Sequence, residues 1–259
     1  MNKLLIATAA VALATAGTAG AADLPYKAPP MQAVAPVQTW TGCWVSGGVG
    51  YGMWNQESHE ETNPGLVSLN NTDVTHGGRG WLGRVGVGCD YQFASSFVIG
   101  AFGDYDWANI HGTFDSENFL LAGNEKLSRQ WAAGGRIGYL PSPNLLTFIS
   151  GGWTEARFDG VTLSSTVGPA VALDTFPSND YRGWFIGGGY EYQVPWAGFN
   201  GLYWKTEYRY SNFRTADLAV STIAGLNAGF AEHMQKYEQT VTTSLVWRFN
   251  WGGPVVARY

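Results

Sequence analysis

Apolar and polar side chains alternate at every second position along most of the chain. In the stretch GLYWKTEYRYSNF, the charged residues Lys205, Glu207 and Arg209 share one parity, and rings such as Trp204 and Tyr208 share the other. Successive side chains of a β-strand point to opposite faces, so a period of two predicts a strand with one apolar and one polar face. We therefore expect the three charges on one side of the strand and the rings on the opposite side.

This alternation recurs in about eight segments, which predicts about eight strands. In chain order the segments are GCWVSGGVGYGMW, RGWLGRVGVGCDYQF, FVIGAFGDYDW, RQWAAGGRIGYL, LLTFISGGWTEARF, GWFIGGGYEYQV, GLYWKTEYRYSNF and QTVTTSLVWRF. The fifth segment alternates less clearly, and its faces stay unassigned. The second, fourth and sixth segments each open on Trp and close on Tyr, which predicts rings at the two interfaces of an apolar band.

The connections between these segments alternate in length. Short turns are expected at 94–96, 141–144 and 195–200. The ranges 55–78, 108–127, 159–180 and 214–236 are long and polar or Gly-rich, so we expect loops there. Short turns at one end and long loops at the other are typical of an all-β, eight-stranded antiparallel up-and-down transmembrane β-barrel.

The N-terminal residues resemble a secretory signal peptide. A Lys is followed by an apolar run and by small residues, which predicts a signal peptide at 1–22 with cleavage near Ala21 or Ala22. A Pro-rich periplasmic leader is expected at 23–39 and the barrel domain at 40–259, with both termini in the periplasm. No later segment has the roughly 20 apolar residues of a membrane-spanning helix, so strands would have to cross the membrane.

Composition and charge agree with a membrane barrel. The chain has 35 Gly, 12 Trp, 13 Tyr and 13 Phe but only 14% charged residues, and rings and Gly at this level suit packed strands with interfacial girdles. A net charge of -5 gives no indication of nucleic acid as a partner. A soluble, lipocalin-like barrel would place the apolar parity inside. The low charge and the expected loops at one end favour the membrane barrel.

The charges on the polar parity balance. A barrel of about eight strands is filled by its own side chains, and an unpaired buried charge costs several kcal/mol. We therefore expect a charge-paired lumen, made of Arg84, Asp90, Asp104, Asp106, Arg136, Glu191, Lys205, Glu207, Arg209 and Arg248.

Several motifs resemble the RopB-type, porin-family outer-membrane proteins of alphaproteobacteria, which have an OmpA-like transmembrane barrel domain. They are AADLPYKAPP, TWTGCWVSGGVGYG, GCDYQF with FVIGAFGDYDWANI, and the closing RFNWGGPVVARY. The resemblance implies insertion into the bacterial outer membrane by the barrel-assembly machinery. Roles in such families include envelope integrity, small-pore activity, surface antigenicity and, in some relatives, haem binding. The chain continues past Phe249 to Tyr259, so either aromatic residue could be the assembly signal.

The two cysteines, Cys43 and Cys89, lie on the apolar parity. If the first two strands pair so that facing residue numbers sum to 132, the cysteines are directly opposite each other and Val45 faces Val87. Facing residues are close enough for a disulfide, and the cell envelope is oxidising. We predict a structural disulfide; two free thiols are the alternative.

The four histidines, His59, His76, His111 and His233, all fall in the expected long loops. Imidazoles there could capture haem or a metal, although their spacing matches no metal motif and they could equally be polar loop residues. No metal site is assigned and no cofactor is expected.

Asp104 and Asp106 share one strand face and could form an acid/base pair. Ion pairing with Arg84 and Arg136 is the alternative that we favour. Because no Ser-His-Asp set is visible either, we expect no catalytic residues and no enzyme activity.

The sequence predicts a structural, surface-facing barrel with at most a narrow pore. The alternatives are a porin-like diffusion channel and a haem-binding surface receptor. The expected partners are the outer-membrane lipid bilayer, lipopolysaccharide and, during biogenesis, the barrel-assembly machinery. The oligomeric state is not predicted.

Overall fold

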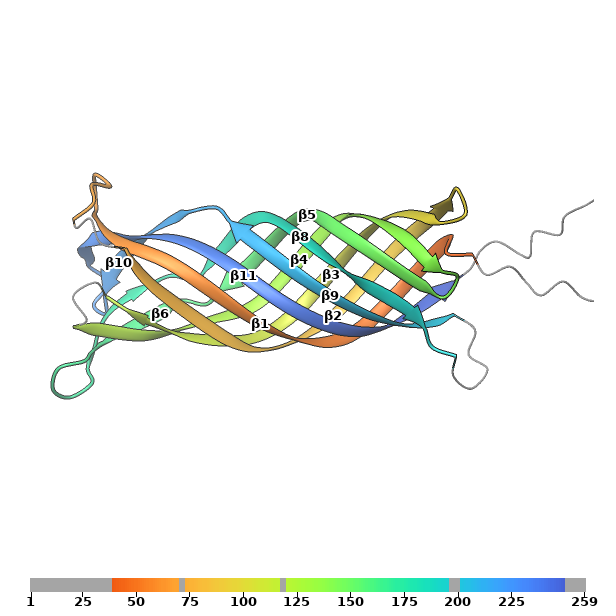
Figure 1. The fold of residues 1–259 in the computed structure, drawn as a ribbon. Helices are drawn as coiled ribbons and strands as arrows, with labels where there is room; N and C mark the ends of the chain where they lie inside the picture. The colour runs from red at the N-terminus through yellow and green to blue at the C-terminus, as the bar shows by residue number, and fades with distance from the viewer. Residues whose placement is uncertain (1–38, 70–72, 117–119, 196–200, 250–259) are drawn as a thin grey trace, which may run out of the picture. The chain divides into compact units, whose positions relative to one another are not determined.

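The computed structural model describes residues 39–69, 73–116, 120–195 and 201–249, and the regular elements within these ranges are all strands (Figure 1). No helix in these ranges is long and apolar enough to cross a membrane. The predicted signal peptide, nearly all of the predicted leader and the residues after Phe249 lie outside the described residues. So does the choice between Phe249 and Tyr259 as an assembly signal.

Eight strands close into a ring, and each is antiparallel to both neighbours. We call this circuit the membrane ring. In spatial order it consists of β1 (Gly42–Thr62), β2 (Val74–Phe93), β3 (Phe97–Asp115), β4 (Leu121–Ser142), β5 (Leu145–Phe158), β8 (Asn179–Gln193), β9 (Leu202–Phe213) and β11 (Asn227–Phe249), which pairs with β1. The predicted eight-stranded up-and-down barrel is confirmed.

The two faces of the membrane ring differ as the alternation predicted. Trp204 and Tyr208 on β9 are 45% and 46% exposed, whereas Lys205, Glu207 and Arg209 between and beside them are at most 4% exposed. On the fifth strand, which the sequence left unassigned, Ile149 and Trp153 point outward, whereas Leu146 and Phe148 point inward. The apolar parity therefore faces outward, and the polar parity fills the lumen.

Tryptophans mark one edge of the outward apolar band. On β2, β3, β4, β5 and β8, going away from the turn end, the outward apolar residues end at a Trp. The next outward residue in that direction is polar or charged. These pairs are Trp81 and Arg79, Trp107 and Asn109, Trp131 and Arg129, Trp153 and Glu155, and Trp184 and Arg182. Tyr91, Tyr139 and Tyr192 point outward near the opposite, turn end. Two ring girdles around an apolar band are typical of a barrel wall in contact with lipid.

Three short strands extend the barrel beyond this band. They are β6 (Val161–Ser165), β7 (Ala172–Phe176) and β10 (Ala216–Thr222), and in Figure 1 the labelled β6 and β10 lie at the same end of the barrel. β6 pairs with β4 and β7, and β10 pairs with β7 and β11. A second circuit results, which we call the distal ring: β1, β2, β3, β4, β6, β7, β10 and β11.

The prediction of four long loops was therefore wrong over much of their length. β1 continues to Thr62 and β2 begins at Val74, while β3 and β4 run far into 108–127. The hairpin β6–β7 occupies much of 159–180, and β10 with the start of β11 occupies much of 214–236. The short turns between β2 and β3 and between β4 and β5 are confirmed.

The reason for this error is that the apolar face reverses in the distal ring. On β1 the outward residues after Met53 are Asn55, Glu57, His59 and Glu61. The interior instead holds a buried apolar cluster made of Phe114, Val161, Leu163, Phe176, Val220 and Met234. Burial of apolar side chains is favourable when the outer surface of the wall is in water, so the pattern differs from that of a wall in lipid.

The predicted disulfide is confirmed. Cys43 faces Cys89 in the predicted register, Val45 faces Val87, and the cysteine Cα atoms are 3.9 Å apart. Glycine makes room for a ring near this hairpin: a Cβ on Gly88 would lie 2.5 Å from the Trp44 ring.

Candidate functional site

The charged interior begins near the turn end with two arginines and two carboxylates. Arg136 donates from Nε and Nη2 to the two carboxylate oxygens of Asp90, at 2.8 and 2.5 Å. Arg248 donates to Asp90 at 2.8 Å and to Glu191 at 2.7 Å, and Arg136 also donates to Glu191 at 3.3 Å. The four buried charges cancel, and each carboxylate is shared by both guanidinium groups.

Trp40, just before β1, lies buried at this end of the interior. It is 1% exposed, and its Nε1 donates to the carbonyl oxygen of Pro143 at 3.1 Å. The Arg248 guanidinium lies 4.6 Å from the centre of its ring, and Tyr203 packs against it at 4.8 Å. A cation over a ring face is attracted by the ring quadrupole, so Trp40 both fills the lumen and holds Arg248.

A second charged group lies farther from the turn end. Arg84 holds Asp106 through two hydrogen bonds of 2.7 Å. Arg209 holds Asp104 through two, at 2.9 and 2.7 Å. Glu207 lies 3.0 Å from Lys205 and 3.2 Å from Arg209. Paired two-point contacts between guanidinium and carboxylate are among the stronger hydrogen bonds in proteins.

The structure brings the ten predicted lumen residues together in these two groups. The expected partner of Asp106, Arg84, is present, but Arg136 does not pair with Asp104 or Asp106. The register explains why: Arg136 faces Gly100, four residues closer to the turn end than Asp104. Arg209 from β9 takes the place of Arg136.

A third charged group was not predicted. Lys236 on β11 donates to Glu125 at 2.7 Å and also to Gln56, and its ammonium lies 4.4 Å from the centre of the Phe158 ring. Burial lowers the pKa of Lys236, while Glu125 opposes this shift. Lys236 has the same parity as Arg248. A predicted last strand that began earlier than residue 239 would therefore have assigned Lys236 to the lumen.

Glu125 could not have been found in this way. The pairing of β4 shifts between Leu127 and Arg129, so inward residues are even-numbered on one side of this irregularity and odd-numbered on the other. A one-residue irregularity moves every later side chain to the opposite face.

The four histidines lie on strands, not in loops as predicted. His76 points into the distal ring, where its ring stacks on Phe114 with centroids 4.8 Å apart and burial lowers its pKa. His111 points outward on β3, with Nε2 2.9 Å from Asn109 Oδ1. Neither of these two lies with another histidine.

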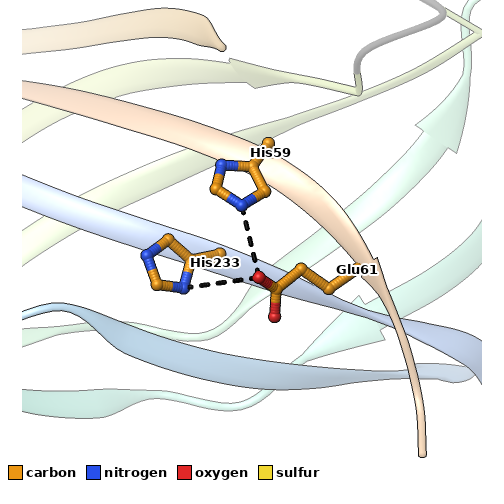
Figure 2. Close-up of side chains that lie close together, drawn as sticks. All are labelled: His59, Glu61 and His233. Atoms are coloured by element: carbon orange, nitrogen blue, oxygen red, sulfur yellow. Dashed lines mark hydrogen bonds and ion pairs between the residues drawn. The ribbon is translucent and has the colours of Figure 1, made fainter. Parts of the chain in front are cut away.

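His59 and His233 do come together, on the outer surface of the distal ring. They face each other across the β1–β11 pairing, with stacked rings whose centroids are 4.7 Å apart. Figure 2 shows both rings directed toward the carboxylate of Glu61, which follows His59 on the same face of β1. The three donor atoms lie within 4.8 Å of one another, so these residues could hold a metal ion.

The sequence is similar to known outer-membrane proteins, although no family model matches it. It is 27% identical over 263 residues to the 31 kDa outer-membrane immunogenic protein of Brucella melitensis, and equally so to that of Brucella suis. Each match covers 96% of this chain and 100% of the relative.

Two solved barrels with low sequence identity also match. The outer membrane protein OprG of Pseudomonas aeruginosa matches at 10% identity and a TM-score of 0.47, covering 81% of this chain and 97% of that chain. The outer membrane protease OmpT of Escherichia coli matches at 12% identity and a TM-score of 0.38, covering 80% and 97%.

The whole-length sequence similarity and the ring of eight strands with its apolar outer band agree with each other and with the RopB-type resemblance. The chain is a β-barrel protein of the bacterial outer membrane, homologous to the 31 kDa outer-membrane immunogenic proteins of Brucella.

Proposed function

We propose that the barrel has a structural and surface-facing role in the cell envelope and forms at most a narrow pore. The observation that carries this proposal is the packed, charge-paired interior. Two groups of ion pairs cross the lumen of the membrane ring, and a third, at Lys236, lies beyond them. Trp40 adds a buried ring at the turn end.

The energetics of the interior support a closed lumen. A continuous water path would require several of these side chains to move apart. Separating Arg84 from Asp106, or Arg209 from Asp104, would leave charges in a space where both partners are at present almost fully buried. An uncompensated buried charge costs about 3–5 kcal/mol, so spontaneous opening would be rare.

Ion conductance in a planar lipid bilayer tests the proposal. The purified, refolded barrel should be silent at voltages where a porin gives steps, and boiled protein serves as the unfolded control. A Lys236→Ala/Glu125→Ala variant should also be silent, because the two groups in the membrane ring still close the lumen. Steady conductance steps from the unaltered protein would contradict the proposal and favour the porin-like channel.

We also propose that the protein is not an enzyme and uses no catalytic cofactor. Asp104 and Asp106 are each held by an arginine, so neither is available as a general acid or base. The haem-receptor alternative gains little support from His59 and His233, because stacked rings 4.7 Å apart leave no room for a porphyrin between them. A haem titration with a Soret shift would revive that alternative.

The remaining expectations concern topology and partners. In bacterial barrels the short turns are periplasmic and the longer connections extracellular, so we place the turn end in the periplasm and the distal ring outside. Lipopolysaccharide would surround the outward face, and the barrel-assembly machinery would insert the chain. We keep cleavage near Ala21 or Ala22, the leader 23–39 and the barrel domain 40–259. N-terminal sequencing of the protein purified from outer membranes would test the cleavage site.

A further inference from the structure

Three neighbouring strands bring histidine and carboxylate side chains together on the outer surface of the distal ring. His59 on β1 faces His233 on β11, and His233 in turn faces Asp217 on β10. Glu61 lies two residues beyond His59 on the same face, and Asp73 precedes β2. Strand pairing thus fixes the backbone positions of four of the five residues.

The donor atoms already lie close to the spacing of a metal site. Glu61 Oε1 lies 3.3 Å from His59 Nε2 and 3.9 Å from His233 Nδ1, as the dashed lines in Figure 2 mark. Ligands at 2.0–2.2 Å around a tetrahedral ion are about 3.3–3.6 Å apart. Small side-chain rotations would therefore bring these three atoms around one ion. Asp217 Oδ1 lies 2.5 Å from His233 Nδ1 but outside this group of three, so its side chain would have to rotate to become a fourth ligand.

Asp73 supplies an independent feature of metal-binding histidines. Its Oδ1 lies 3.0 Å from His59 Nδ1, on the side of the ring opposite Glu61. Histidines that bind metals usually donate their second ring N–H to a carboxylate, which fixes the tautomer and the ring orientation. With the proton on Nδ1 held by Asp73, the lone pair of His59 Nε2 points toward Glu61 and the space beside it.

The charge of the cluster also favours a cation. Three carboxylates surround two imidazoles, and the ion pairs of Glu61, Asp73 and Asp217 among the described residues are with His59 and His233. The side chains of Glu61 and His59 are 12% and 23% exposed, so the site is partly shielded but open to an entering ion. A bound divalent cation would offset the mutual repulsion of the carboxylates.

We propose that His59, His233 and Glu61 bind one divalent first-row transition metal ion, with Asp217 as the fourth ligand and Asp73 as the residue that orients His59. Two imidazoles with carboxylates suit Zn²⁺ and other divalent first-row ions such as Ni²⁺ and Cu²⁺, whereas Mg²⁺ and Ca²⁺ prefer oxygen ligands. The site joins the first and last strands of the barrel, so the ion would also link β1 to β11 and β10.

Zinc binding by the folded protein tests this proposal. Tag-free protein, extracted with detergent and treated with EDTA, is titrated with Zn²⁺ in competition with a chromophoric chelator. We expect one ion per chain, no displacement of Zn²⁺ by millimolar Ca²⁺, and d–d absorption of tetrahedral intensity when Co²⁺ replaces Zn²⁺. Failure to bind Zn²⁺, or equal binding of Ca²⁺, would overturn the proposal.

Variants assign the ligands. His59→Asn combined with His233→Asn should abolish the stoichiometric site. Asp73→Asn should weaken binding by about 10-fold to 100-fold, as expected for a residue that orients a ligand. His111→Asn, another outward histidine on a strand of the distal ring, should leave binding unchanged and is the matched control. Folding of each variant is checked by its heat-modifiable gel mobility. Undiminished Zn²⁺ binding by the folded double variant would reject the site.

Discussion

The membrane ring and the distal ring are built on the same long strands but present different outer surfaces. The membrane ring has an apolar outer surface, and in its interior the ion pairs centred on Asp90, Asp106 and Glu207 lie among buried rings such as those of Trp44, Phe102 and Phe185. The distal ring has a polar outer surface and an interior that includes an apolar cluster around Leu163 and Phe176. Strands such as β1 and β3 pass from one arrangement to the other without interruption.

This difference in outer surface agrees with the proposed placement of the membrane ring in lipid and of the distal ring in water. Lipid allows apolar side chains to face outward from the membrane ring, while the polar residues inside it must satisfy one another. If water surrounds the distal ring as proposed, burial of apolar side chains inside it is favoured. Substitutions in the two interiors should therefore have different consequences for the barrel.

The largest effect is expected from Asp90→Ala. This change removes one of the two carboxylates that Arg136 and Arg248 share and leaves Glu191 to balance both arginines inside the membrane ring. Removing one partner of a buried ion pair costs about 3–5 kcal/mol, and two affected arginines place this case near the upper end. Urea unfolding in lipid vesicles, followed by tryptophan fluorescence, measures the loss. A shift below about 1 kcal/mol would show that water already reaches these charges.

A slightly smaller global loss is expected from Cys43→Ala with Cys89→Ala. The disulfide spans a sequence separation of 46 residues across the first hairpin of the membrane ring. The chain-entropy model gives roughly 4 kcal/mol for such a loop. Unfolding of the unaltered protein with and without reductant gives the same comparison without mutation. Detection of two free thiols in the unreduced protein would contradict the disulfide itself.

In the distal ring, Leu163→Ala should act locally. Leu163 is fully buried in the apolar cluster, and a buried Leu→Ala change typically costs about 3 kcal/mol. Because β6 pairs only with β4 and β7 among the described strands, we expect faster amide exchange and proteolysis in the β6–β7 hairpin. The urea midpoint of the membrane ring should stay unchanged. Thr162→Ala, at an exposed neighbouring position, is the control.

An equal loss of unfolding free energy in the membrane ring on Leu163→Ala would mean that the two rings unfold as one unit. Amide exchange measured strand by strand separates these outcomes, because local opening leaves the strands of the other ring protected.

The smallest effect is expected from Arg182→Gln. Arg182 donates to Glu155 at 2.7 Å on the outer wall, one outward position beyond Trp184, and its side chain is 66% exposed. Exposed ion pairs contribute about 0–1 kcal/mol, so the unfolding free energy should hardly change. A loss comparable to that of Asp90→Ala would show that exposure does not separate the two kinds of ion pair.

The sequence predicted the membrane ring and ten of its buried charges, but not Glu238, which is 1% exposed and lies near Arg84 and Asp106. Alternation with a period of two directly encodes a wall between lipid and a polar lumen, which is why Arg84, Asp104 and Glu207 were all assigned inward. The register considered for the first hairpin, in which facing residue numbers sum to 132, is the one that the structure has, with Cys43 opposite Cys89.

The distal ring escaped prediction because its pattern reverses. Beyond Trp107, the outward residues Asn109 and His111 are polar, while Ile110 and Phe114 point inward. Because the apolar residues change parity within one strand, the part beyond the apolar band does not continue the pattern before it. That part is therefore interpreted as a polar loop, although the strand continues. The histidine cluster depends on this continuation, since His59 and His233 meet only when β1 and β11 pair beyond the apolar band.

The pairing of β1 with β11 runs from Cys43–Phe249 to Thr62–Phe230. The backbone of the first strand therefore has its second partner only after the last strand has formed. Until β11 arrives, β1 presents a long row of unpaired backbone groups, which the hydrocarbon of a bilayer cannot solvate. A chain that stops before β11 therefore cannot settle as a partial barrel in lipid. Pairing of β11 with β1 and stable residence of the barrel in lipid are therefore coupled.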